Sequence, residues 1–517
     1  MENLSNLVFK VLSKIEKDPE QWSYWTQEQT LSSISSSDVM KEFVQTLETI
    51  KKKGEKVIVA GDYDCDGIMA TTIMVDGLRR YGIECGFYIP DRIHEGYGLQ
   101  VNTVHLAHKK GYSWIITVDN GVKAFPALLE AKQLGMHTIV TDHHILEEEV
   151  PSDLLVHPTL MEPEFSSLCG AALAYECIRS LHQDTSYHLQ LASIASIGDC
   201  MQVKGQTRAI IQQGLKLLNS EKETHLIHLA RDASLDETSV GFQIVPKLNA
   251  VGRLSNLANV NNVVRYFLSK DHVEITNLRQ QIQDLNEHRK KLSDQMCRHA
   301  LKKCQIQNKV LIVSDPSYHE GIIGLVAGSL CEKTKKPAIV LAQNAQGFKA
   351  SMRCPEGFNC MDFLSDFDQF QAMGGHPQAC GFSLDLQAYP AFVQYIKERS
   401  LQYTWQELEK DTLKVTEDQL TLAEVQSLDQ LRPFGPGFEC PLFEIEHPLI
   451  TKINDFQNRK HRKYILSGGL ECVNFNQSDK DRDQSLNSIQ SLIGKVQVSQ
   501  YRGRKNVSFV IQEIVYS

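Results

Sequence analysis

Short apolar runs alternate with stretches of helical periodicity between residues 57 and 141. The mostly β-branched run 57–60 predicts a buried strand, and the apolar positions after residue 67 predict a helix. Residues 114–118 and 138–141 predict two more strands, with a stretch of helical composition, 124–135, between them. Strands that alternate with helices are typical of a parallel sheet. We therefore predict an α/β domain built on a parallel sheet.

Two changes of pattern divide the rest of the chain. Residues 271–303 carry apolar side chains at intervals of three, four or seven in a charged stretch, which predicts one long helix connecting two domains. A coiled-coil dimerisation arm is the competing interpretation, which the polar pair His288 and Arg289 weakens. From about residue 404 the composition becomes polar, and short strands with basic residues then suit a small nucleic-acid-binding barrel. The predicted units are residues 1–37 (an N-terminal arm), 38–268 (the first α/β domain), 269–305 (the connecting helix), 306–403 (a second α/β domain) and 404–517 (a linker and a β-barrel).

Acidic residues and histidines follow the predicted strands of the first domain directly. They are Asp62, Asp64, Asp66, Asp119, Asp142, His143 and His144. Because the carboxyl ends of parallel strands meet at one edge of a sheet, a shared ligand explains the coincidence. Asp199 closes an apolar segment of small residues, where a bare carboxylate is costly without a partner. Carboxylates suit Mg²⁺ and Mn²⁺. For the stretch with Asp62, Asp64 and Asp66 taken alone, an Asp/Gly-rich surface turn is the alternative.

Several segments combine glycine with arginine, serine or histidine, a composition typical of phosphate contacts. Residues 245–253 look like a compact polar loop, and residues 349–353 and 374–376 form a candidate clasp in the second domain. The alternatives to phosphate contacts are a solvated loop arginine at position 92 and a structural histidine at position 376. For the basic residues 459–463 and 501–505 of the predicted barrel, the alternative is a solvated hairpin. On this pattern the candidate phosphate-binding residues are Arg92, Ser351, Arg353, Gly374, Gly375 and His376.

Composition and charge limit the classes of protein that fit. With 517 residues the chain is too long for one compact core, and its net charge of -9 argues against a histone-like polycation while allowing a local basic groove. The 13 cysteines lack paired CxxC spacing, which predicts reduced thiols rather than a disulfide framework. We see no signal peptide and no apolar run long enough to cross a bilayer, so we predict a soluble cytoplasmic protein without a membrane partner.

Four segments resemble, in order, the four motifs of the DHH phosphoesterase superfamily. They are Asp62-Tyr-Asp-Cys-Asp-Gly67, Val118-Asp-Asn-Gly121, Asp142-His-His144 and Asp199. Five more resemble its RecJ branch: Asp91-Arg-Ile-His-Glu-Gly-Tyr-Gly-Leu99, Asn249-Ala-Val-Gly-Arg253, His319-Glu-Gly-Ile-Ile-Gly324, Gly374-Gly-His376 and Pro433-Phe-Gly-Pro-Gly437. The similarity covers roughly residues 40 to 517.

The resemblance implies a DHH domain, a connecting helix, a DHHA1 domain and an OB-fold. It implies a 5′→3′ exonuclease that hydrolyses single-stranded DNA to mononucleotides in DNA repair and recombination. Two Mn²⁺ or Mg²⁺ ions would be held by Asp64, Asp66, Asp119, His143 and Asp199, with Asp62 and His144 as catalytic residues beside them. The resemblance also implies that substrate phosphates are bound by Arg92, Asn249, Arg253, Ser351, Arg353 and His376. Single-stranded DNA is the expected partner, a single-strand-binding protein and a helicase are candidate protein partners, and a monomer is expected.

Two other functions compete with this interpretation. One is a DHH phosphodiesterase for short oligonucleotides or cyclic dinucleotides, which needs neither the long helix nor the barrel. The other is a non-catalytic DNA-binding replication scaffold, which is expected to lose metal ligands. The sequence departs from the family pattern around Asp199, at His157 (usually Asn) and at Phe438 (commonly Asn), and none of these departures removes a predicted ligand.

Overall fold

The computed structural model describes residues 4–221, 225–232, 234–406, 410–457, 459–475, 484–501 and 504–517. The predicted parallel sheet is present in the order β2-β1-β3-β4-β5. Its strands are β1 (Val57–Ala60), β2 (Cys85–Tyr88), β3 (Trp114–Val118), β4 (His137–Thr141) and β5 (Leu154–Val156). β1 and β3 are buried throughout, as expected of strands covered on both faces.

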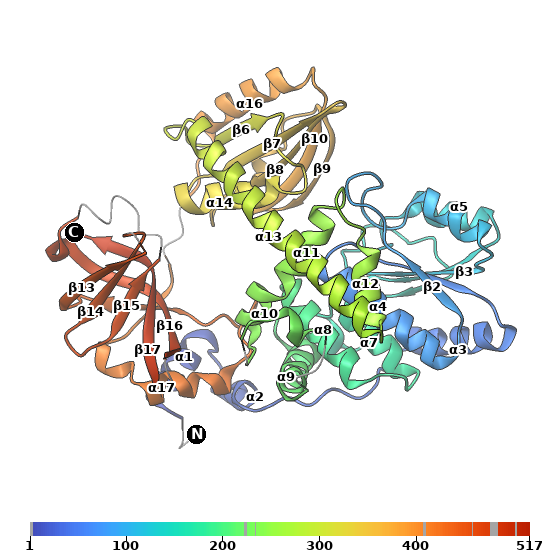
Figure 1. The fold of residues 1–517 in the computed structure, drawn as a ribbon, viewed down its shortest axis with the longest axis horizontal. Helices are drawn as coiled ribbons and strands as arrows, with labels where there is room; N and C mark the ends of the chain where they lie inside the picture. The colour runs from blue at the N-terminus through green and yellow to red at the C-terminus, as the bar shows by residue number, and fades with distance from the viewer. Residues whose placement is uncertain are drawn as a thin grey trace.

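Alternate residues of β1 enter two different cores. Val57 and Val59 face the core formed with α3 (Asp38–Lys53), α4 (Cys65–Tyr81), α7 (Gly170–Ser180) and α8 (Ser186–Gly198). Ile58 and Ala60 face the core formed with α5 (Val101–Lys109) and α6 (Phe125–Gln133). The sheet lies between these two helical layers, with α5 on one side and α3 on the other (Figure 1), and the acidic turns follow the carboxyl ends of its strands.

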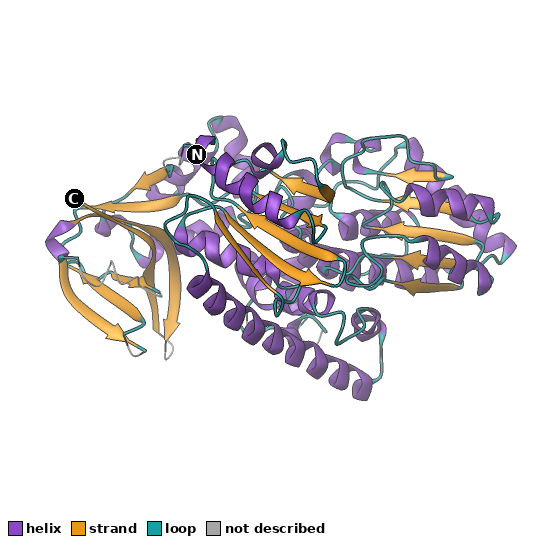
Figure 2. Ribbon diagram, turned by 90° about the horizontal axis from the view of Figure 1, so that it is seen from above, coloured by secondary structure: helices purple, strands orange, loops and turns teal. Residues whose placement is uncertain are grey.

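Helices α9 (Gly205–Ser220), α10 (Glu237–Gln243), α11 (Val245–Arg253) and α12 (Asn261–Leu268) complete the first domain. The prediction of a polar loop at 245–253 was wrong, because this segment is helix α11. Its apolar residues Val245, Leu248 and Val251 recur every three positions and are buried, so tertiary packing turns a polar-looking segment into a helix. The long connecting helix α13 (His272–Lys303) begins at Asp271, whose side chain accepts the amide of Val273. It runs along one side of the molecule (Figure 2).

The second domain has a mixed sheet in the order β6-β7-β8-β10-β9. Its strands are β6 (Leu311–Asp315), β7 (Ala338–Asn344), β8 (Gly347–Arg353), β9 (Phe370–His376) and β10 (Ala379–Leu384). Helix α14 (Ile323–Thr334) packs with α13 on one face, and α15 (Cys360–Leu364) and α16 (Tyr389–Gln402) cover the other. The strand register places Arg353, Ala379 and His376 side by side across β8, β10 and β9.

The C-terminal domain is the predicted β-rich unit, and the N-terminal arm is packed against it. Its sheet runs in the order β11-β12-β16-β17-β15-β14-β13. The strands are β11 (Thr412–Lys414), β12 (Leu442–Glu446), β13 (Ile450–Phe456), β14 (His461–Leu466), β15 (Glu471–Asn474), β16 (Ile489–Tyr501) and β17 (Arg504–Tyr516). Helices α1 (Asn6–Ile15), α2 (Trp22–Thr26) and α17 (Leu422–Ser427) share its core, as Figure 1 shows.

Short 3₁₀ helices connect these elements. They are η1 (Pro19–Gln21), η2 (Pro158–Leu160), η3 (Pro163–Phe165), η4 (Ile227–Leu229), η5 (Glu417–Gln419), η6 (Leu428–Leu431) and η7 (Leu486–Ser488). Among the described residues, no helix has both the length and the apolar character that crossing a membrane requires.

Candidate metal and phosphate centre

The acidic turn after β1 is held by backbone contacts at two of its aspartates. Asp64 caps α4, its Oδ1 accepting the amide of Gly67 at 3.1 Å. The carboxylate of Asp66 accepts the amides of Gly170 (2.7 Å) and Ala171 (2.8 Å). These amides open α7, where unpaired N–H groups and the helix dipole favour an anion. The turn therefore has a fixed shape before any ligand arrives.

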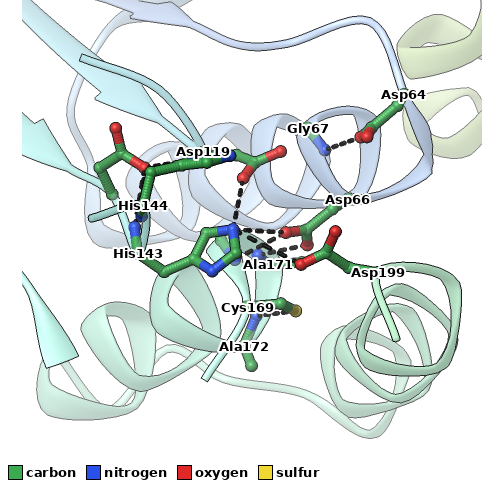
Figure 3. A network of polar contacts seen from close by, with 12 residues as sticks. Asp64, Asp66, Gly67, Asp119, His143, His144, Cys169, Ala171, Ala172 and Asp199 are labelled. Atoms are coloured by element: carbon green, nitrogen blue, oxygen red, sulfur yellow. Dashed lines mark hydrogen bonds and ion pairs between the residues drawn. The ribbon is translucent and has the colours of Figure 1, made fainter. Parts of the chain in front are cut away.

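Side chains from four separate segments meet in front of this turn (Figure 3). The Nε2 atom of His143 lies 3.1 Å from Asp119 Oδ1, 3.5 Å from Asp199 Oδ2 and 3.7 Å from Asp66 Oδ2. Asp119 and His143 follow β3 and β4, and Asp199 ends α8. Asp119 adopts a left-handed backbone with φ of 60°, and its amide is bonded to Thr141 O on β4. The predicted convergence at the sheet edge is thus present.

The predicted metal and catalytic residues form three overlapping groups, in each of which one ligand atom per residue lies within 4.8 Å of the others. They are Asp119 with His143 and His144, Asp66 with His143 and Asp199, and Asp62 with Asp64 and Asp119. The structure therefore brings all seven residues together.

A second cluster, of arginines, lies beside the acidic one. Arg92 stacks over the ring of Tyr63 at 4.8 Å, and Arg353 donates to Ser351 Oγ at 2.8 Å. Burial and the charges of Arg92, Arg289 and Arg353 lower the pKa of Arg253 to about 10. Guanidinium groups close enough to shift the pKa of one another repel unless an anion lies among them. Their arrangement suits a phosphate group.

Three families of known domains match the chain. The family model of the DHH N-terminal domain matches residues 56–201, the DHHA1 domain 307–400 and the RecJ OB domain 412–513. The single-stranded-DNA-specific exonuclease RecJ of Bacillus subtilis is 30% identical over 504 residues, covering 92% of this chain and 63% of the relative. The RecJ of Thermus thermophilus is 30% identical over 413 residues, covering 78% of this chain and 61% of the relative. This chain belongs to the RecJ family.

Solved RecJ structures share the fold. The RecJ of Thermus thermophilus in complex with Mn²⁺ has a TM-score of 0.83 at 24% identity, over 99% of this chain and 78% of that one. An exonuclease RecJ bound to manganese has a TM-score of 0.63 at 29% identity, over 72% of this chain and 97% of that one. The chain spans less than two thirds of the length of the two RecJ relatives above.

The acidic cluster of this RecJ-family chain fits a divalent cation. Burial raises the pKa of Asp62, Asp64 and Asp119, and neighbouring carboxylates raise it further. Burial and the charges of Asp66 and Asp64 raise the pKa of Asp199 to about 8. Asp62 Oδ1 is buried and has no hydrogen-bond partner among the described residues. Several carboxylates without a counter-charge are costly, and oxygen donors with one imidazole suit Mn²⁺ or Mg²⁺.

Asp142 is a functional residue to which the sequence interpretation assigned no role of its own. Its Oδ1 lies 2.7 Å from His144 Nδ1 and accepts the amide of His143, while Oδ2 accepts the amide of Val122. Burial by itself lowers the pKa of His144, but the hydrogen bond and charge of Asp142 outweigh it and raise that pKa. The signal was the aspartate in the Asp142-His143-His144 triplet. A buried carboxylate beside paired histidines is the usual means of orienting a ring.

Arg289 and Tyr97 were also missed. Arg289 lies on α13, far along the chain from the predicted clasp, and donates to Asn286 Oδ1 while its buried Nε has no partner among the described residues. Its signal was the polar break in the apolar stripe of the long helix. The hydroxyl of Tyr97 donates to the carbonyl of Asp119 at 3.0 Å.

The remaining predicted positions, and the departure His157, have specific surroundings. Asn249 Oδ1 accepts the amide of Cys65 at 2.7 Å, so this oxygen holds the acidic turn. His157, one of the departures, has Nε2 2.9 Å from the carbonyl of His144. Gly375 and His376 line a cavity together with Tyr97 and His144, and Gly374 precedes them on β9.

Ion pairs partly neutralise the basic residues 459–463 of the C-terminal domain. Arg462 makes a two-point ion pair with Asp455 (2.8 and 3.2 Å), and Lys463 pairs with Glu471 at 2.7 Å. His461 is buried and its ring packs against Phe456 and Phe475. Residues 502–503 of the predicted basic turn lie outside the described part of the chain.

Proposed function

We propose that the chain is a divalent-metal-dependent exonuclease that removes mononucleotides from the 5′ end of single-stranded DNA. The observation that carries the proposal is the pairing of two opposite clusters: buried carboxylates around His143, and arginines around Arg253. The first can hold cations at a scissile phosphate, and the second can hold the phosphate at the end of the strand. The RecJ relatives named above support this choice of substrate.

Two cations, when bound, would activate a water molecule and neutralise the charge that develops on the phosphate. Asp64, Asp66, Asp119, His143 and Asp199 would hold them, and the α7 amides fix Asp66 for this task. Asp142 binds Nδ1 of His144, which leaves Nε2 as the atom that can exchange a proton with the substrate. Asp62 is buried at the start of the turn and would orient or share an ion.

The arginine cluster would set the polarity of cleavage. Arg92, Arg253 and Arg353, together with Ser351, offer forked donors suited to a terminal phosphate, which carries more charge and more free oxygens than an internal one. Arg289 adds a fourth positive charge from the connecting helix. A strand whose 5′-phosphate is bound here would present its next phosphate to the acidic cluster.

The deciding experiment is a polarity assay on the full chain with Mn²⁺. Single strands labelled at the 5′ or the 3′ end, a blunt duplex and a dinucleotide are the substrates. We expect early release of the 5′ label as a mononucleotide, and little action on the duplex. Release from the 3′ end, or hydrolysis of the dinucleotide alone, would refute the proposal. The variant Asp119→Asn should be inactive with an unchanged circular dichroism spectrum, and calorimetric titration of Mn²⁺ should give two ions per chain.

A further inference from the structure

A cavity of about 530 Å³ lies between the first and second domains, next to the acidic cluster. Tyr97, Asp142 and His144 belong to both the cavity and the site described above. Gly375 and His376 of β9 form the side of the cavity that the second domain contributes. The volume falls within the ~300–1,000 Å³ typical of small-molecule sites. Nothing in the function proposed above uses this space.

The wall that faces β9 is largely apolar. Leu99, Val101, Val122, Pro126 and Ile145 contribute to it. Ile145 is 69% exposed, which is unusual for a large aliphatic side chain beside a charged site. An apolar wall next to an aromatic side chain, here Tyr97, suits a flat ring bound by burial and stacking. Lys123 and Glu147 also line the cavity, but they pair with each other at 2.8 Å, so neither charge is left free for a phosphate or a metal ion.

The register of the second sheet gives the distance from Arg353 of the arginine cluster to His376 of the cavity. Arg353 on β8 pairs with Ala379 on β10, and Ala379 pairs with His376 on β9. Two strand spacings separate Arg353 from His376, roughly 10 Å. A nucleotide whose 5′-phosphate lies at Arg353 and whose 3′-phosphate lies at the acidic cluster can therefore extend its base to the His376 side.

We propose that the cavity binds the nucleobase of the 5′-terminal nucleotide, the one about to be released. The inference rests on the proposed exonuclease function and adds a third contact to the terminal nucleotide, after its two phosphates. Because the apolar residues named above and the ring of Tyr97 would contact the face of the base, and every base has such a face, any of the four bases can occupy the cavity. The contact thus favours a terminal nucleotide with an intact base without selecting a sequence.

The test compares three 5′-phosphorylated single strands: an ordinary strand, one with an abasic residue at position 1 and one with it at position 2. The full chain is assayed with Mn²⁺ for kcat/KM of the first cleavage. An abasic residue at position 1 should lower kcat/KM about 10-fold, the size of one lost base-stacking contact. An abasic residue at position 2 should lower it less. A larger loss at position 2 would overturn the assignment to the terminal base.

The variant Ile145→Asp tests the cavity itself, with Leu129→Asp as its matched control. Leu129 lies on α6, is 48% exposed and is not part of the cavity lining. Ile145→Asp should lower kcat/KM about 10-fold on the ordinary strand and much less on the strand that is abasic at position 1, because the two changes remove the same contact. Equal losses on both strands would overturn the proposal. Leu129→Asp should match the wild type on both.

A binding measurement separates this proposal from the proposed function. A strand with 2-aminopurine at position 1 is titrated with the metal-free chain, and its fluorescence reports whether the terminal base is stacked. We expect quenching with the wild type and with Leu129→Asp, and its loss with Ile145→Asp. Quenching without hydrolysis after Mn²⁺ is added would refute the exonuclease function alone. Quenching by Ile145→Asp equal to that of the wild type would refute the cavity assignment alone.

Discussion

The substitution Gly170→Ala tests how tightly the acidic cluster is packed. Gly170 opens α7, and its amide donates to Asp66 Oδ2 at 2.7 Å. A Cβ atom at this position would lie 2.4 Å from Asp119 Cβ and 2.7 Å from Asp119 Cγ and Oδ1. These separations are far below van der Waals contact, so either Asp119 or the start of α7 must move.

Neither element can move without disturbing the candidate metal site. The amide of Asp119 is bonded to Thr141 O, which fixes this residue to β4 at a positive φ. Movement of α7 would instead withdraw the two amides that hold Asp66. Forcing one carbon into a packed interior costs about 1–3 kcal/mol of folding free energy. A ligand displaced by about 1 Å costs on the order of 100-fold in rate.

The assay measures Mn²⁺-dependent hydrolysis of single-stranded DNA together with the rise in melting temperature that Mn²⁺ produces. Gly170→Ala should lose about 100-fold in kcat and most of the Mn²⁺-dependent stabilisation. Gly328→Ala is the control, since it lies in α14 and its Cβ would meet no described atom within 4 Å. Wild-type turnover and wild-type Mn²⁺ stabilisation in Gly170→Ala would refute the reasoning.

Three further substitutions test other parts of the structure. Arg208→Met should lower the free energy of unfolding by about 1–3 kcal/mol for each carbonyl left without its donor, because the buried guanidinium donates to the carbonyls of Trp25, Leu431 and Pro433; an unchanged melting temperature would contradict this role. Burial raises the pKa of Glu176 from 4.5 to about 7, so its contribution to stability is complete below about pH 4.5 and is lost as the pH rises through about 7. Urea unfolding should therefore give a lower free energy of unfolding at about pH 8 than at about pH 5, and Glu176→Gln should reduce this difference. An equal difference in both proteins would count against the role of Glu176. Asp142→Asn should weaken Mn²⁺ binding or turnover by about 10–100-fold, because it removes the charged partner of His144; calorimetry and the nuclease assay measure the two effects, and wild-type values in both would show that Asp142 is dispensable.

The first sheet and the acidic cluster could be predicted because both depend on local patterns. A β-branched run followed directly by Asp62, Asp64 and Asp66 identifies a strand and its carboxyl end, and parallel pairing then brings separate strand ends together. The strands and the metal-type residues are therefore encoded within a few positions of one another. This locality explains why the fold class was confirmed and why the aspartates and histidines that follow the strands converge. Asp199, which ends α8, joins them through the packing of that helix.

Properties that depend on distant contacts were not predictable in the same way. Helix α11 was mistaken for a loop because Pro246, Asn249 and Gly252 are residue types typical of loops, and only burial of its apolar face by the surrounding helices reveals the helix. Arg289 belongs to the arginine cluster only because α13 crosses the first domain. The N-terminal arm gave no chemical signal because its role is packing: Trp25 stacks on Phe438 at 3.8 Å, with Arg208 over both rings.

Helix α11, the element that the sequence pattern missed, joins the two halves of the site. Asn249 holds the amide of Cys65 in the acidic turn, and Arg253, four residues later, belongs to the arginine cluster. Between them, a Cβ on Gly252 would lie 2.4 Å from the carbonyl of Tyr63, so the helix is pressed against the turn itself. Helix α11 therefore fixes the arginine cluster relative to the acidic turn, as the proposed release of one nucleotide at a time requires.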